Sequence, residues 1–123
     1  MSRDSDHGRV ALRAFFEIAK QWELNDIERV RLLGQTDDGV IDDWANDEGP
    51  DLSKDTLERI SYILGIFKAI NILLPMPKRA NAWMRKPNRA PIFGGRSALD
   101  RMTAGNVSDL YVVRKYLDAQ LNS

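Results

Sequence analysis

The sequence predicts an all-α fold, on three observations. Residues 53–74 form a long apolar stretch in which hydrophobic residues recur at three- and four-residue steps, the spacing of a helical face. On both sides of this stretch, capping residues and glycines divide the chain into shorter helices. No strand-like alternation of polar and apolar residues runs over a useful length. The 123 residues suit one compact domain or two very small ones.

The central helix is predicted to begin after Ser53, whose hydroxyl can accept a hydrogen bond from an amide of the first turn, and to end at Pro75. Its second half is apolar around most of its circumference, so we expect other elements to cover it from several sides. These elements can belong to this chain or to a second copy, and we expect a homodimer through this helix. The apolar part contains Lys68 and Asn71 and is shorter than the roughly 20 residues of a membrane span, which favours a core helix.

The first helix is predicted over residues 9–23, after a polar start (residues 2–8) that we expect to be frayed. Its predicted apolar stripe consists of Val10, Ala14, Phe15, Ile18, Ala19 and Trp22.

A second helix is predicted over residues 26–33. Asn25 and Glu28 have the spacing of a capping box at its start, and Gly34 stands where a left-handed residue is needed at its end. A third helix should follow through Val40, Ile41 and Trp44, before a break at residues 46–50. Two short helices around a glycine-containing turn, packed on a longer helix, are typical of a helix-turn-helix.

The second half is predicted to contain a helix over residues 78–85, a tight turn at Phe93-Gly94-Gly95, a short helix over residues 98–103 and a last helix over residues 107–121. Ser97 is suitable as the cap of the short helix and Asn106 as the cap of the last one.

Charge is distributed unevenly along the chain, although the formal net charge is zero. Residues 37–58 contain nine acids against Lys54 alone, and residues 68–101 contain eight bases against Asp100 alone. Such asymmetry indicates partner surfaces, unless the two regions lie side by side and neutralise each other. The chain has no cysteine and its start has no apolar segment behind a basic one, so we expect a cytoplasmic protein without disulfides, cysteine–zinc sites or a secretory signal.

The second half resembles the toxin-binding C-terminal domain of the Xre/MbcA/ParS antitoxins. The matching residues are Ala82-Trp83-Met84-Arg85-x-Pro87-Asn88, then Phe93-Gly94-Gly95-Arg96-Ser97-Ala98-Leu99-Asp100-x-Met102, then Gly105 and Tyr116-Leu117-Asp118-Ala119. The first half is similar to the Xre-like part of that family, with Leu32-Leu33-Gly34 closing its second helix. The resemblance implies an Xre-like helix-turn-helix bundle with the central helix over residues 1–75 and a toxin-binding domain over residues 76–123.

The resemblance implies an antitoxin of a type II toxin–antitoxin system. The usual partner in this family is a RES-domain toxin that acts on NAD, either consuming it or transferring ADP-ribose from it. Members of the family commonly dimerise, form a hetero-oligomer with the toxin and can bind their own promoter DNA. The alternative is a helix-turn-helix transcriptional regulator without a toxin partner.

The candidate toxin-binding residues lie in the basic, aromatic second half, because arginines and aromatic side chains dominate many protein interfaces. They are Arg85, Asn88, Arg89, Arg96, Ser97, Arg101, Tyr116, Asp118 and Leu121. In the alternative interpretation Trp83 and Phe93 belong to the core and the arginines are solvated. An NAD pocket must hold a pyrophosphate and should therefore be positively charged. A last helix carrying the negative Asp118 could enter such a pocket; equally, that helix could merely close the core of this chain.

The candidate DNA-binding residues are Arg29, Arg31 and Thr36. Affinity for DNA comes mainly from lysines and arginines that neutralise phosphates. Residues 36–43, which would enter the groove, contain four carboxylates and no base, so strong DNA binding by the chain alone is not expected.

We expect neither catalysis nor a bound cofactor. His7 is the sole histidine, and no nucleophile has a visible base partner. Asp42, Asp43 and Asp47 lack the spacing of a calcium loop, and Gly94-Gly95 lacks the other glycines of a dinucleotide-binding turn.

Overall fold

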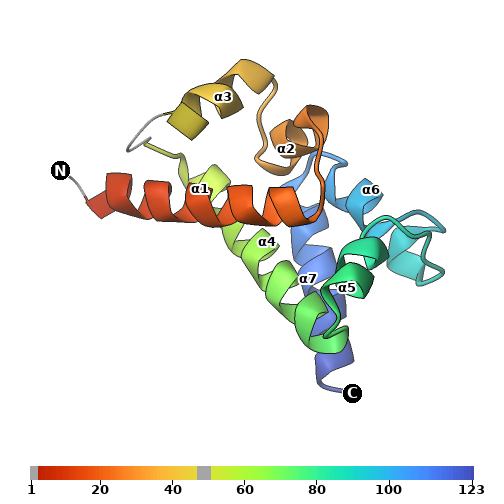
Figure 1. Ribbon diagram of the computed structural model, residues 1–123. Coiled ribbons are helices and arrows are strands. Elements are labelled where there is room, and N and C mark those ends of the chain that lie inside the picture. Colours follow the sequence, from red (N-terminus) through yellow and green to blue (C-terminus); the bar gives the residue numbers. More distant parts are fainter. Residues whose placement is uncertain (1–2, 47–50) are drawn as a thin grey trace.

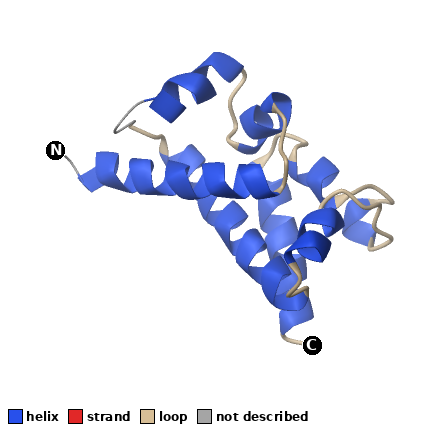
Figure 2. Ribbon diagram, in the orientation of Figure 1, coloured by secondary structure: helices blue, strands red, loops and turns tan. Residues whose placement is uncertain are grey.

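The computed structural model describes residues 3–46 and 51–123, which form seven α-helices and one 3-10 helix without any strand (Figures 1 and 2). The all-α prediction is therefore confirmed. The elements are α1 (Arg3–Gln21), α2 (Asp26–Leu32), α3 (Asp38–Asn46), α4 (Lys54–Leu73), α5 (Pro77–Trp83), η1 (Pro91–Phe93), α6 (Ala98–Met102) and α7 (Val107–Leu121).

Helix α4 is the central element, on which α1, α5 and α7 pack. Its start is capped as predicted, since the Ser53 hydroxyl accepts a hydrogen bond from the Thr56 amide at 3.1 Å. Helix α7 makes the most extensive contact with α4, and α1 crosses α4 toward the N-terminal end of α4 (Figure 1). Tyr62 lies against Tyr111, and Gly65 lies against Arg114, so α4 and α7 run in the same direction.

One chain covers most of α4 by itself. Its buried face includes Ile60, Ile63 and Ile66, whereas Leu64 and Ile72 remain 36% and 55% exposed on the outer side. A second copy would therefore have to cover only the outer side of α4, where Leu64 and Ile72 are exposed.

Two details of α1 differ from the prediction. The helix begins at Arg3, so the frayed start is wrong for residues 3–8, while residues 1–2 lie outside the described part. Val10 is 65% exposed, and Leu12, at 3%, takes its place in the buried stripe. Leu12 is three residues from Phe15, one helical step along the same face, whereas Val10 falls on the opposite side.

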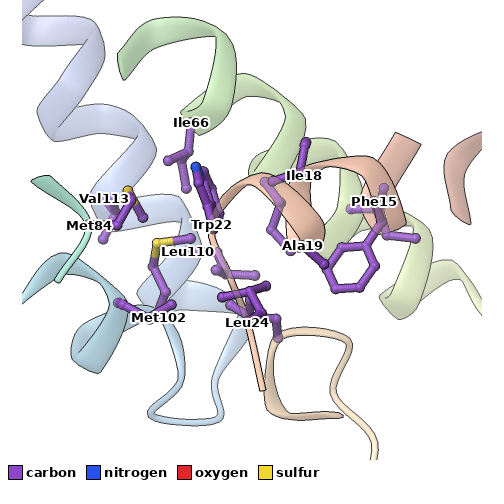
Figure 3. Packing of buried hydrophobic residues seen from close by; sticks show 14 of the residues in the cluster. Phe15, Ile18, Ala19, Trp22, Leu24, Ile66, Met84, Met102, Leu110 and Val113 are labelled. Atoms are coloured by element: carbon purple, nitrogen blue, oxygen red, sulfur yellow. The ribbon is translucent and has the colours of Figure 1, made fainter. Parts of the chain in front are cut away.

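A single hydrophobic cluster includes residues from both halves of the chain (Figure 3). Trp22 and Leu24, after α1, lie in the same packed region as Ile66 of α4, Met102 of α6 and Leu110 of α7. Among the described residues, no helix has the length and apolar character needed to cross a lipid bilayer. The predicted break at residues 46–50 falls mostly on residues 47–50, outside the described part.

Candidate functional site

Five of the nine predicted toxin-binding residues lie on loop 85–97, which joins α5 to α6 and contains η1, while the other four lie on α6 and α7. The loop is closed on itself: the Asn88 amide donates to the Arg96 carbonyl at 2.9 Å, and the Asn88 side-chain oxygen accepts from the Ala90 amide at 2.9 Å. Gly94 and Gly95 have φ values of 58° and 83°, which allow the tight turn after η1. The loop therefore has a defined shape built from its own backbone.

Three aromatic rings lie under this loop. Phe93 meets Trp83 edge to face at 6.0 Å between ring centroids and Tyr116 edge to face at 5.2 Å. Phe93 is 4% exposed, and the other two rings are half-buried. Phe93 is thus part of the core, as the alternative interpretation held, and Tyr116 joins α7 to the loop.

Arg85 reaches from the start of the loop to the connection between α1 and α2. Its guanidinium donates to both carboxylate oxygens of Glu28, at 3.0 and 3.1 Å, and to the carbonyls of Trp22 and Glu23 at 3.1 and 2.9 Å. Burial acts to raise the pKa of Glu28, but the hydrogen bonds from Arg85 and Asn25 and the Arg85 charge together hold that pKa below its ordinary value. The Arg85 guanidinium therefore already has hydrogen-bond and ion-pair partners within this chain.

Arg101 and Ser97 also have internal partners. Arg101 donates to the Ile92 carbonyl at 2.7 Å and to the carboxylate of the buried Asp109 at 2.9 Å, which joins η1, α6 and α7. Ser97 caps α6, as predicted, by accepting from the Asp100 amide at 3.0 Å. Both residues shape the surface.

Arg89 and Arg96 are different from these residues. Both are exposed, and within residues 3–46 and 51–123 neither side chain has a hydrogen-bond or ion-pair partner. Lys86, on the same loop, is exposed and unpaired in the same sense. The loop thus presents three cations outward.

The candidate residues of α7 are held near its end. Asp118 accepts from Arg114 through both carboxylate oxygens at 3.1 Å. The Arg114 guanidinium occupies the space above Gly65 of α4, where a side chain would collide with it. Leu121 is half-buried against the core. Arg114 consequently links Asp118 on α7 to the surface of α4.

The candidate DNA-binding residues lie on and beside α2. Arg29 approaches Asp26 at 3.7 Å, while Arg31 and Thr36 line an open hollow of about 530 Å³. The other lining residues are Ile27, Val30, Gln35 and Asp37. On α3, Asp42 and Asp43 are exposed, so the surface beside this hollow is acidic.

The acidic region (residues 37–58) and the basic region (residues 68–101) do not neutralise each other through ion pairs in the described part of the chain. The cross-element pairs there are Arg85–Glu28 and Arg101–Asp109, and neither joins one region to the other. The ion pairs between described residues therefore do not support the alternative in which the two regions neutralise each other.

Sequence reasoning missed Arg59. It is 7% exposed on α4, and its guanidinium donates to Asp55 at 2.8 Å and to the Gly105 carbonyl at 3.1 Å. Gly105 lies in the loop before α7, and an arginine within an apolar stretch was the only sequence signal for this contact.

The described residues include no group of three or more histidine or carboxylate side chains placed to hold a metal ion. Asp47, part of the acidic cluster considered above, lies outside the described residues. His7 is exposed on α1.

An all-α chain whose internally hydrogen-bonded loop 85–97 exposes three cations has the features of a protein-binding module. Residues 69–121 match the family model described as the antitoxin Xre/MbcA/ParS C-terminal toxin-binding domain. A protein of Sinorhizobium fredii (strain NBRC 101917 / NGR234) described as uncharacterized protein y4oB is 46% identical over 121 residues, covering 97% of this chain and 92% of that protein. Over residues 69–121 the chain therefore carries the toxin-binding domain of the Xre/MbcA/ParS antitoxin family.

Proposed function

We propose that the chain is the antitoxin of a type II toxin–antitoxin system and that its toxin is a RES-domain protein acting on NAD. In this proposal the antitoxin binds the toxin in the cytoplasm, covers its active site and does no chemistry itself. The match of residues 69–121 to a toxin-binding domain carries the proposal. The exposed cations of loop 85–97 support it, since arginine is enriched at the centres of interfaces.

Within the candidate set, we propose Arg89 and Arg96 as the residues that contact toxin directly. Both are exposed and unpaired in the described part of the chain, so toxin contact would break no internal bond of either side chain. Arg85, Asn88 and Arg101 would contribute mainly by keeping the loop in shape, because their polar groups already have internal partners.

The end of α7 is the part that we propose to cover the NAD pocket. Asp118 would supply negative charge toward a pocket that must hold a pyrophosphate, and Leu121 would supply apolar contact. Because Asp118 is paired with Arg114, it could reach a toxin cation only by exchanging one partner for another. The attachment of α7 to α4 favours a preformed cover over a flexible tail.

Co-expression tests this function. The RES-domain protein encoded nearest to the antitoxin gene would be induced alone and with the antitoxin, while growth and cellular NAD are measured. We expect the antitoxin to restore both and the Arg89→Ala/Arg96→Ala double variant to restore them poorly. Equal NAD loss with and without the intact antitoxin would refute the proposal.

A shortened chain tests the α7 cover. Ending the chain after Ala119 and adding Asp118→Asn removes both proposed contacts but keeps Leu117, which is 1% exposed and belongs to the core. We expect this chain to bind toxin but to inhibit it incompletely. Full inhibition at equal occupancy would rule out the cover.

We also propose a homodimer through the outer side of α4, where Leu64 and Ile72 remain uncovered. Light scattering of Leu64→Glu and Ile72→Glu should then show monomers, while Val10→Glu, at an exposed apolar position on α1, should stay dimeric. A monomeric parent chain at high concentration would contradict this.

Regulation of its own promoter is the least supported part of the proposal, because the exposed face of α3 carries Asp42 and Asp43. Gel shifts with the promoter fragment, with and without toxin, would show whether toxin supplies the missing positive charge. Arg29, Arg31 and Thr36 remain the residues to substitute if a shift is seen.

A further inference from the structure

Helix α2 is fixed at both ends by arginines that come from later in the chain. At its first turn, Glu28 accepts a hydrogen bond from the Asn25 amide at 2.9 Å and two more from Arg85. Arg85 also donates to the carbonyl of Glu23, whose φ of 54° is left-handed and therefore strained for a residue with a side chain. One guanidinium thus fixes both the cap of α2 and the bend before it.

At the other end of α2, Gly34 rests on Arg59. A Cβ atom at Gly34 would lie 2.5 Å from Nε of Arg59, and the φ of Gly34 is +71°. The same guanidinium donates to the Gly105 carbonyl, while its Nη1 is buried without a partner among the described residues. Arg59 therefore lies between the α2–α3 turn and the loop that leads into α7.

The contacts made by the two arginines flank α6, which lies within the toxin-binding domain. Arg85 is the first residue of loop 85–97, which enters α6, and Gly105 lies in the loop that leaves it. Both contacts connect this domain to a seven-residue helix that is too short to be stable alone. The dependence is mutual, because α2 needs the arginines and the two loops are anchored through them.

We propose that the α2–α3 unit serves as a structural support for the toxin-binding surface, with Arg59 and Arg85 as its positioning residues. The unit fixes loop 85–97 and the start of α7 from outside the toxin-binding domain. This role needs no basic surface, so it is compatible with the acidic face of α3, which is poorly suited to DNA. It is also independent of which toxin the surface binds.

A substitution at Gly34 tests the Arg59 contact in the free, full-length chain. Gly34→Ala should displace the Arg59 guanidinium and remove its bond to the Gly105 carbonyl, which would shift the NMR amide signal of Asn106. Gly94→Ala is the matched control, because Gly94 has a φ of +58° but nothing within 4 Å of a Cβ there. An unchanged Asn106 signal in Gly34→Ala, or the same shift in both variants, would overturn the proposal.

Amide hydrogen exchange tests Arg85 with a milder change. Arg85→Lys keeps the charge but cannot reproduce four hydrogen bonds, so the amides of Asn88 and Leu99 should exchange about tenfold faster, the effect of losing one or two net bonds. The core amide of Ile66 reports global stability and should change much less. Arg29→Lys, on α2 itself, should leave all three rates within about twofold of the parent chain.

The second experiment remains decisive even if Gly34→Ala fails to fold. Equal acceleration at Asn88, Leu99 and Ile66 would mean that Arg85 contributes only to global stability. No acceleration at any of them would mean that loop 85–97 keeps its shape without α2. Either result would refute the positioning role, and neither depends on whether the chain neutralises a RES-domain toxin.

Discussion

Two arginines of the toxin-binding domain should respond very differently to removal of their side chains. Arg101 donates to the Ile92 carbonyl at 2.7 Å and to Asp109 at 2.9 Å. Asp109 is 8% exposed, so Arg101→Ala leaves a buried carboxylate without its cation. Arg89 is exposed and has no such partner within the described part of the chain. The comparison therefore separates internal from outward-facing positive charge.

Breaking one side of a buried ion pair costs about 3 to 5 kcal/mol. The Arg101 side chain is 34% exposed, and Asp109 keeps a hydrogen bond from the Asn106 amide at 3.3 Å. We therefore expect a loss of about 2 to 3 kcal/mol for Arg101→Ala, since solvent reaches part of this pair. For a chain of this length that loss lowers Tm by about 6 to 10 °C. Arg89→Ala should change stability by less than about 0.5 kcal/mol.

Urea unfolding followed by far-UV circular dichroism measures both variants, and a thermal scan gives the Tm values. Arg101→Lys is a useful third variant because it retains the charge but not the forked geometry, and it should lose about 1 kcal/mol. If Arg101→Ala is as stable as the parent chain, or if Arg89→Ala loses as much as Arg101→Ala, the division into internal and outward-facing arginines is wrong.

Three further changes probe other parts of the fold. Phe93→Ala should lose about 3 to 4 kcal/mol in urea unfolding, since it empties a buried aromatic site; a loss below about 1 kcal/mol would place Phe93 outside the core. Gly65→Ala should stabilise the chain by about 1 kcal/mol only in an Arg114→Ala background, because the helix propensity gained is offset by displacement of Arg114 when that side chain is present. A double-mutant cycle measures this, and equal effects in both backgrounds would contradict the contact. The pKa of Glu28 is lowered in the folded chain from 4.5, so the contribution of Glu28 to folding stability is fully present above about pH 4.5 and is lost as the pH falls through the folded pKa. The stability difference between the parent chain and Glu28→Gln should therefore be constant near neutral pH and decrease in acid. A constant difference down to pH 3 would refute the pairing with Arg85.

Local features of the fold could be predicted from the sequence. The caps at Ser53, Asn25 and Ser97 were all correct, because an N-cap depends on residues only three positions apart. The central helix was also correct to within a residue at each end, since its period and its following proline are local signals. The family motif in the second half also identified loop 85–97 as a candidate binding site, because that motif is a local sequence pattern.

The roles of individual arginines could not be predicted. Arg85 and Glu28 are separated by 57 residues, and nothing in the local pattern distinguishes Arg85 from Arg89. Their separation into internal and outward-facing residues depends on how the helices cross. The exposure of Val10 was missed for a related reason, since α1 has apolar residues on more than one side and its buried side is chosen by α4. Which candidate residues touch toxin remains a prediction.

The contact between Glu28 and Arg85 has a consequence for the order in which the protein forms during its synthesis. Helix α2 leaves the ribosome early, but the guanidinium that completes its first turn is made 57 residues later. Seven residues do not hold a helix in water, so the nascent amino-terminal region cannot reach its final form until residue 85 has emerged. Completion of the early part of the chain is thus linked to the appearance of its late part.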